Sequence, residues 1–227
     1  LPGMIVVGSF TVPLSTMIMF MEVNAWRNIS LYKVIQTFLV GGCASLVATL
    51  MLFSIVGSHE LNLIGAIVTG IVEEAGKAVI VFWFLSKMKR LSILVGLLIG
   101  ASVGAGFAAF ESAGYALQPV LAFFQSIIIR GFLAPGGHVT WAAISGAALV
   151  IAGKALRRFD TSLLTDKRFL RLFIIPVILH AAWDSPMSNI GSSIYLVPIA
   201  LTVIVWIVVM ILINMGLAEV ERVTKRQ

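Results

Sequence analysis

Long apolar runs, separated by short polar segments, follow one another along the whole of the 227-residue chain. A helix that crosses the hydrocarbon core of a bilayer needs about 20 consecutive residues that are mainly apolar. Runs of this kind recur from end to end, so we predict an all-α fold, a polytopic transmembrane helical bundle of about seven spans. The predicted spans cover residues 1–21, 34–56, 61–85, 91–117, 137–153, 172–185 and 192–215.

The composition supports a single membrane domain. Hydrophobic residues make up 59% of the chain and charged residues 11%, whereas a soluble domain carries about 25% charged residues. We therefore expect one integral membrane domain over residues 1–227, with a motif-bearing core at about 61–191. The only cysteine, Cys43, excludes an internal disulfide and a cysteine-based zinc site within this sequence.

The basic residues indicate orientation. They lie between apolar runs and not along an aromatic-lined groove, so we expect a lipid bilayer as partner and no nucleic acid. Cytoplasmic loops carry the Lys and Arg excess, which predicts a cytoplasmic C-terminus and an outer N-terminus. We expect the membrane to be a bacterial plasma membrane. All but two of the 16 Lys and Arg residues fall on this one side, the exceptions being Lys77 and Arg130. The residues on the basic side are Arg27, Lys33, Lys87, Lys89, Arg90, Lys154, Arg157, Arg158, Lys167, Arg168, Arg171, Arg222, Lys225 and Arg226.

Two local patterns refine this arrangement. Basic residues alternate with leucine and phenylalanine from Lys154 to Arg171, which predicts a helix lying at the cytoplasmic interface. Gly96, Gly100 and Gly104 place a small residue at every fourth position of the fourth span. Such spacing lets the backbone of a neighbouring helix approach closely, so we expect these glycines to mark an internal helix contact.

Several ionisable residues fall inside the predicted spans, where a charge costs several kcal/mol unless it has a partner, a cavity or a function. Glu73 and Lys77 are four residues apart and share a helix face, and Glu74 reaches Lys77 at a spacing of three. A neutralised packing cluster is one interpretation. One lysine cannot neutralise two glutamates, however, and the pair therefore favours a function as general base.

The other intramembrane polar residues lie on different spans. His180 and Asp184 are four residues apart, so the carboxylate could orient the imidazole or join it around a metal ion. Glu111 lies on the glycine stripe of the fourth span and faces a helix contact. His138 follows a glycine-rich loop, and Arg130 could pair with a carboxylate or extend to the interface.

The depth of these residues points to one shared site. Glu73 and Glu74 fall near the middle of their span, and the polar residues of the three other spans fall towards the outer ends. A water-accessible cavity in the outer half of the membrane explains this distribution better than unrelated packing contacts. A proton-coupled transporter would instead distribute polar residues from one membrane face to the other.

The ordered set of motifs resembles the PrsW intramembrane proteases, which are related to the CAAX prenyl endopeptidases and bacteriocin-processing enzymes. Glu73-Glu74-Ala75-Gly76-Lys77 corresponds to EExxK, Phe107 to Glu111 corresponds to FxxxE, and His180 to Asp184 corresponds to HxxxD. Arg130 and His138 correspond to a basic residue and a histidine between the second and third motifs. No single motif is specific for this family, but the whole set in this order is.

The resemblance implies an intramembrane endopeptidase that hydrolyses a peptide bond of a single-span membrane protein, such as an anti-sigma factor, from the extracytoplasmic side. It implies Glu73 as general base with Glu74 as its partner, and Glu111 as the residue that orients water. It also implies that His180 and Asp184 stabilise the oxyanion, with His138 in the catalytic set and Lys77 and Arg130 in support. A catalytically silent scaffold that binds membrane proteins is the alternative with the same fold.

The part played by a metal ion is open at the level of sequence. Glu111, His138 and His180 could bind zinc, because carboxylate oxygens and imidazole nitrogens are zinc ligands. The HExxH motif is absent from the sequence, and a carboxylate-rich site could also activate water without a metal.

Overall fold

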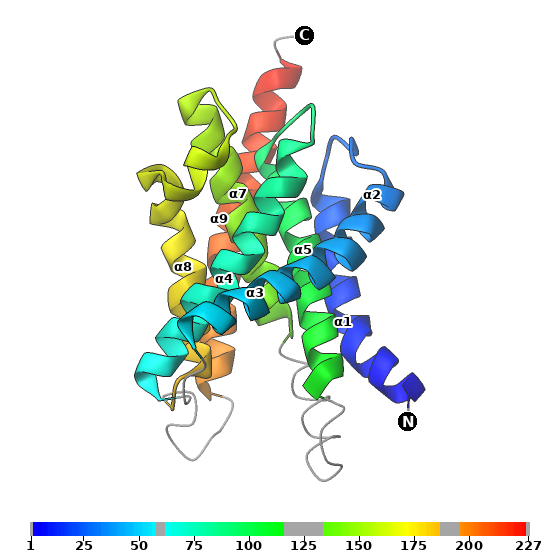
Figure 1. Cartoon of the computed structure of the whole chain (residues 1–227). Coiled ribbons are helices and arrows are strands. Elements are labelled where there is room, and N and C mark those ends of the chain that lie inside the picture. The colour runs from blue at the N-terminus through cyan, green and yellow to red at the C-terminus, as the bar shows by residue number, and fades with distance from the viewer. Residues whose placement is uncertain (1, 58–61, 116–133, 187–195, 226–227) are drawn as a thin grey trace.

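The computed structural model describes residues 2–57, 62–115, 134–186 and 196–225, and a long helical segment lies at each predicted span. No strand occurs in these four ranges, and the predicted all-α fold is confirmed. Figure 1 shows the helices as a bundle. They are α1 (Pro2–Val23), α2 (Leu31–Gln36), which continues through a π-helical turn (Thr37–Gly41) into α3 (Gly42–Val56), α4 (Leu63–Ser86), α5 (Ile93–Tyr115), α7 (His138–Leu156), α8 (Lys167–Asp184) and α9 (Leu196–Thr224).

Five helical segments among the described residues are long and apolar enough to cross a membrane. These are α1, α2 with α3, α5, α7 with the turn before it, and α9. The helices α4 and α8 carry more charged residues, in part because they hold the candidate site. The chain is thus an integral membrane protein, and the count of seven spans stays a prediction.

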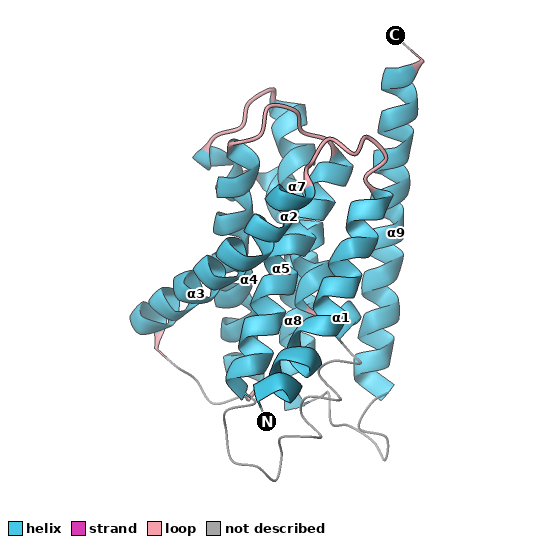
Figure 2. Ribbon diagram, turned by 90° about the vertical axis from the view of Figure 1, so that its right-hand side faces the viewer, coloured by secondary structure: helices cyan, strands magenta, loops and turns pink. Residues whose placement is uncertain are grey.

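The helix α5 lies inside the bundle, against α1, α3 and α7 (Figures 1 and 2). Its glycines Gly96, Gly100 and Gly104 face backbone carbonyl groups of α7. A Cβ atom at Gly100 would lie 2.0 Å from the carbonyl oxygen of Ala142, and one at Gly104 would lie 2.2 Å from that of His138. Only glycine permits this approach, so the predicted helix contact is confirmed. The contact also holds the first residue of α7, His138, beside the end of α5 that carries Glu111.

Two further close approaches position α4. Gly70 faces the backbone of Val177 and Ala181 on α8, where a Cβ atom would lie 3.0 Å from the carbonyl oxygen of Val177. Gly76 faces Thr49 on α3, where a Cβ atom would lie 2.6 Å from the hydroxyl oxygen. The face of α4 that bears the glutamates is therefore held against both α3 and α8.

The predicted interfacial helix from Lys154 to Arg171 is wrong. Helix α7 ends at Leu156, and Arg157 adopts the left-handed conformation with φ of 54°, which turns the chain away from the helix axis. A short 3-10 turn (Thr161–Thr165) follows, and the Asp166 side chain accepts a hydrogen bond from the backbone N–H of Arg168 to begin α8. The left-handed turn at Arg157 and the N-cap at Asp166 therefore decide the structure of this segment, and the amphipathic pattern does not.

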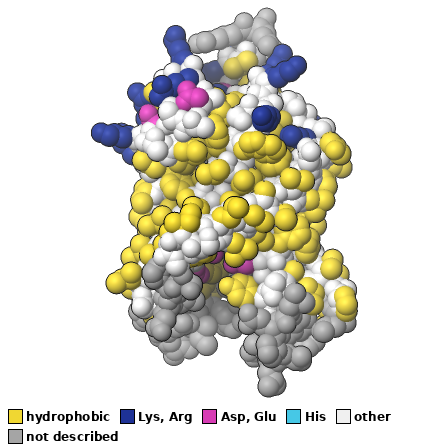
Figure 3. All heavy atoms as spheres, viewed as in Figure 1, with side chains coloured by type: hydrophobic (Ala, Val, Ile, Leu, Met, Phe, Trp, Pro, Cys, Tyr) yellow, Lys and Arg dark blue, Asp and Glu magenta, His cyan; other side chains and the backbone are white. Residues whose placement is uncertain are grey.

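The loops that carry the basic residues lie at one end of the bundle, which is the upper end in Figure 3, above a broad apolar belt. The candidate site residues lie away from that end. Glu111 is in the last turns of α5, His138 opens α7, and His180 and Asp184 lie at the end of α8. Which end faces the cytoplasm stays a prediction from the charge distribution.

Candidate active site

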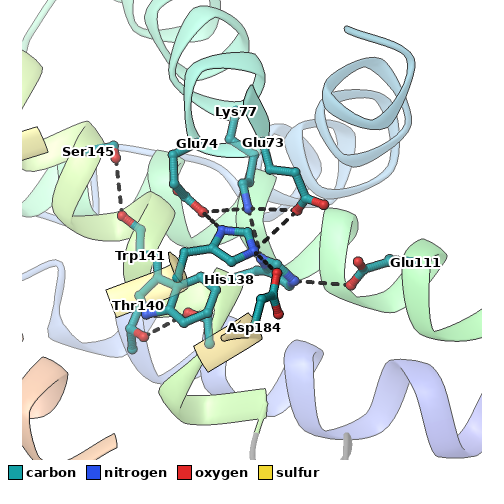
Figure 4. Close-up of polar contacts among 11 residues, drawn as sticks. Glu73, Glu74, Lys77, Glu111, His138, Thr140, Trp141, Ser145 and Asp184 are labelled. Carbon is teal, nitrogen blue, oxygen red and sulfur yellow. Dashed lines mark hydrogen bonds and ion pairs between the residues drawn. The ribbon is translucent and has the colours of Figure 1, made fainter. Parts of the chain in front are cut away.

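A buried ammonium group, that of Lys77, lies at the centre of the polar cluster (Figure 4). Its Nζ atom is 2.7 Å from Oε1 of Glu74 and 3.7 Å from Oε2 of Glu73, so it contacts both carboxylates on its own helix. It also donates to Nδ1 of His138 on α7, at 2.8 Å. The side chains of Lys77 and Glu74 have no solvent exposure. The i, i+3 and i+4 spacing of the sequence motif thus produces the expected contacts.

The contact with Lys77 determines the protonation pattern of His138. An ammonium group can only donate, so Nδ1 of His138 accepts its hydrogen bond. The other ring nitrogen, Nε2, then carries a hydrogen and donates to Oε2 of Glu111 at 3.0 Å. A chain of polar contacts therefore runs from α4 through α7 to α5, where it reaches the Glu111 carboxylate.

The second imidazole, that of His180, joins α8 to the cluster. Its Nδ1 atom is 2.8 Å from Oε1 of Glu74, while its Nε2 atom is 3.2 Å from Oδ2 of Asp184 and 3.6 Å from Oε2 of Glu73. With one proton on Nδ1, the lone pair of Nε2 would face two carboxylates. A second ring proton or a bound cation removes that repulsion, so this side of His180 is suited to bind a cation or to donate a hydrogen bond.

Aromatic rings enclose the cluster. The ring of Trp141 stacks on that of His180, with centroids 4.5 Å apart and an interplanar angle of 27°. The Phe107 ring lies below the Lys77 ammonium group, whose nitrogen is 4.2 Å from the ring centroid, a cation–π distance. Sequence reasoning missed Trp141. Its spacing of three residues from His138 on one helix face was the available signal.

The cluster holds more acid than base. It brings together four carboxyl groups, one ammonium group and two imidazoles. Oε2 of Glu73 and Oε2 of Glu74 are buried and have no hydrogen-bond partner. Buried polar atoms are nearly always paired, so these orphaned oxygens point to a ligand, a water molecule or an ion in the working enzyme.

Metal binding is compatible with part of this cluster. Ligand atoms of Glu73, His138 and His180 lie within 4.8 Å of one another, and together they form a His₂Glu set of the kind that binds catalytic zinc. The orphaned oxygen of Glu73 supports the fit. Two of the three expected ligands belong to this group. The third, Glu111, contacts His138 from the other side of the ring.

A cavity of about 270 Å³ adjoins the cluster and has Glu73 and Glu111 in its wall. Acidic side chains are visible in a hollow of the lower half of the molecule (Figure 3), on the side away from the basic end. The remaining lining residues are Leu46, Thr49, Leu50, Phe53, Phe107, Gly114 and Tyr115. Most of them are apolar, so the acids form one polar corner of a hydrophobic cavity.

The sequence-predicted residues thus come together from four helices, α4, α5, α7 and α8. The residues in contact are Glu73, Glu74, Lys77, Glu111, His138, His180 and Asp184. The remaining one, Arg130, lies outside the described residues.

The site thus holds acids and imidazoles that can activate water, among membrane helices and beside a cavity, as the active site of an intramembrane hydrolase requires. A family model described as "PrsW family intramembrane metalloprotease" matches residues 30–213, and the chain belongs to this family. The protein is therefore an intramembrane peptidase, as the sequence resemblance predicted. Comparison with curated proteins and with solved structures finds no match.

The buried lysine provides a test of the site. Removing one partner of a buried ion pair costs about 3–5 kcal/mol, because the other charge stays buried and unpaired. We expect Lys77→Met to lower the free energy of unfolding in detergent by this amount, and Glu74→Gln to recover part of the loss in the double variant. Lys225→Met, which removes an exposed pair with Glu221, should change it by no more than about 1 kcal/mol. Unchanged stability of Lys77→Met would contradict the central position of its ammonium group.

Proposed function

We propose that the protein cleaves single-span membrane proteins of the anti-sigma-factor type, with Glu73 as the base that activates water. The substrate class is the one that the family resemblance implies, and one observation carries the assignment of the base. Oε2 of Glu73 is buried without a hydrogen-bond partner, and the same residue lies in the wall of the cavity. Lys77 and His180 flank this oxygen at 3.7 and 3.6 Å. A proton acceptor that is available, held in place and next to space for water meets the requirements for a general base.

The proposed reaction begins with a water molecule between Glu73 and the scissile carbonyl. Glu73 accepts a proton from this water while its oxygen attacks the carbonyl carbon, and the resulting tetrahedral intermediate carries the negative charge on the former carbonyl oxygen. Glu73 then returns the proton to the leaving amide nitrogen, and the C–N bond breaks. Glu111, oriented by the Nε2–H group of His138, lines the same cavity and orients the water.

His180 and Asp184 are proposed to act on the carbonyl oxygen. Glu74 accepts from Nδ1 of His180 and so fixes the orientation of the ring, while Trp141 supports its face. The Nε2 side of the ring, between Asp184 and Glu73, is left to stabilise the oxyanion as a charged donor. Lys77 supports the same chemistry by holding Glu74 and His138 in position.

A metal ion is compatible with this site. Glu73, His138 and His180 would hold zinc once a ring nitrogen of His138 exchanged its present partner, Lys77 or Glu111, for the metal. The ion would polarise the carbonyl group and water as a Lewis acid. In the ligand set predicted from sequence, Glu111 takes the place of Glu73. If Glu73 binds the metal, Glu111 remains to accept the proton, and if Glu111 binds it, Glu73 remains, because both line the same cavity.

The charge distribution supports the direction of attack. Positively charged loops favour the cytoplasm, which puts the C-terminus there and the site in the outer half of a bacterial plasma membrane. A substrate helix hides its peptide carbonyl groups in intrahelical hydrogen bonds, so the scissile segment has to unwind. Unwinding is easiest at the outer end of the substrate span, where the freed groups can meet water or the enzyme.

Replacement of the base tests the catalytic assignment. Glu73→Gln keeps the size of the side chain but cannot accept the proton, so cleavage of reconstituted single-span membrane proteins should fall by about 10²–10⁴-fold. Glu221→Gln, at an exposed position on α9, should cleave like the wild type. The rates are compared by gel and mass spectrometry in proteoliposomes. Wild-type cleavage by Glu73→Gln would overturn the role of Glu73, and a wild-type protein that binds substrates but cleaves none would favour the scaffold alternative.

Metal analysis tests the metal assignment separately. If zinc takes part in the reaction, the purified protein contains about one zinc ion per chain by elemental analysis, as in other catalytic zinc sites, and His180→Gln loses it. In that case phenanthroline abolishes cleavage and added zinc restores it. Full activity of metal-free protein would show that the carboxylates and imidazoles work without an ion.

A further inference from the structure

One face of α3 lines the same cavity as the catalytic acids. Leu46, Thr49, Leu50 and Phe53 recur at spacings of three and four residues, so they share a single helix face. Phe107 on α5 adds a further apolar side chain, and the acids Glu73 and Glu111 lie in the same wall. The proposed mechanism gives the acids a catalytic role, but it gives no role to the residues of α3.

Within this face, the hydroxyl group of Thr49 has no partner. Thr49 is 3% exposed, and its Oγ1 atom makes no hydrogen bond. Hydroxyl groups on other helices, such as those of Thr16, Thr37 and Ser102, donate to the carbonyl oxygen four residues earlier. A buried hydroxyl that makes neither this bond nor another is costly, and Thr49 is one of the residues that line the cavity, so a ligand bound there is a candidate partner.

Thr49 lies against α4, the helix that carries the catalytic glutamates. It packs on Gly76, where a Cβ atom would lie 2.6 Å from the Thr49 hydroxyl oxygen. Gly76 follows Glu73 by three residues, so the two share one face of α4. The hydroxyl group thus lies along the face of α4 that carries the general base, at a point where only glycine leaves it room.

We propose that this cavity is the subsite for an aliphatic side chain of the substrate residue next to the scissile bond, and that Thr49 donates a hydrogen bond to the backbone carbonyl of the bound segment. The proposal rests on the proposed function. The volume of about 270 Å³ and the mainly apolar lining suit a branched aliphatic side chain, and the two glutamates in the lining disfavour an acidic one. An unwound substrate segment has free carbonyl groups, which a neutral hydroxyl can pair inside the membrane.

Cleavage specificity tests the subsite. The probe is a set of synthetic single-span peptides that carry Gly, Ala, Leu, Phe or Asp beside the bond that the wild type cuts. Leu46→Trp fills the cavity and should lower kcat/KM for the Leu peptide at least tenfold while sparing the Gly peptide, since a hydrophobic pocket discriminates by about 10–200-fold per methylene group. Val47→Trp is the matched control, because Val47 is next in sequence but is not among the residues that line the cavity. Equal preferences in wild type and Leu46→Trp would overturn the subsite.

A second pair of variants tests the hydroxyl group. Thr49→Val keeps the shape but removes the donor, and should lower kcat/KM about tenfold, the effect of one lost hydrogen bond. Thr49→Ser should restore the rate. The thermal midpoint of the substrate-free protein should stay equal or rise in Thr49→Val, because an unpaired buried group is removed. A lower midpoint together with an unchanged kcat/KM would assign Thr49 to helix packing alone.

Photocrosslinking separates failure of the subsite from failure of the proposed function. The Glu73→Gln variant is incubated with the same peptides carrying photo-leucine at the variable position, and the labelled residues are mapped by mass spectrometry. We expect labels on Leu46, Leu50 or Phe53. Labels there without cleavage by the wild type would refute the protease mechanism and keep the subsite. Labels confined to other helices would refute the subsite even if cleavage occurs.

Discussion

The structure depends on one buried positive charge. The Lys77 ammonium group contacts Glu73, Glu74 and His138 at once, and it has no exposure to solvent. A lone ammonium at this depth would cost several kcal/mol, and so would two adjacent carboxylates. The attraction between the ammonium group and the carboxylates offsets most of that cost. The same contacts set the geometry, because a donor-only group forces His138 to accept on one nitrogen and to donate to Glu111 from the other.

Close helix packing makes this cluster possible. The hydrophobic effect gives little drive for helix association in lipid, so helices associate where small residues allow backbone contact. Gly104 brings the start of α7 against α5, Gly70 brings α8 against α4, and Gly76 brings α3 against α4. Each contact lies next to a site residue. The glycines between and within the motifs therefore serve to bring polar side chains from separate helices within hydrogen-bonding distance.

Much of this arrangement could be predicted from sequence. Hydrophobic runs of bilayer length predict the helices, and spacings of three and four residues predict the contacts of Lys77 with Glu73 and Glu74 and of His180 with Asp184. Contacts between different helices were harder to predict. The sequence does not indicate that His180 binds Glu74, that Glu73 and not Glu111 approaches both imidazoles, or that Thr49 lies on Gly76. These follow from helix rotation and crossing, which the pattern of one chain does not specify. The prediction for the segment after Leu156 was wrong for a local reason, because the backbone of Arg157 adopts the left-handed conformation and ends the helix.

The central claim is that water meets the substrate at the buried acid–histidine cluster, in the half of the bundle remote from its basic end. Mapping the cleaved bond tests this most directly. A single-span membrane protein of known orientation is co-reconstituted with the enzyme, and the new termini are identified by mass spectrometry. The account predicts a cut at or just beyond the end of the substrate span opposite its own basic flank. A cut at the basic, cytoplasmic flank would contradict the orientation of the site or its depth.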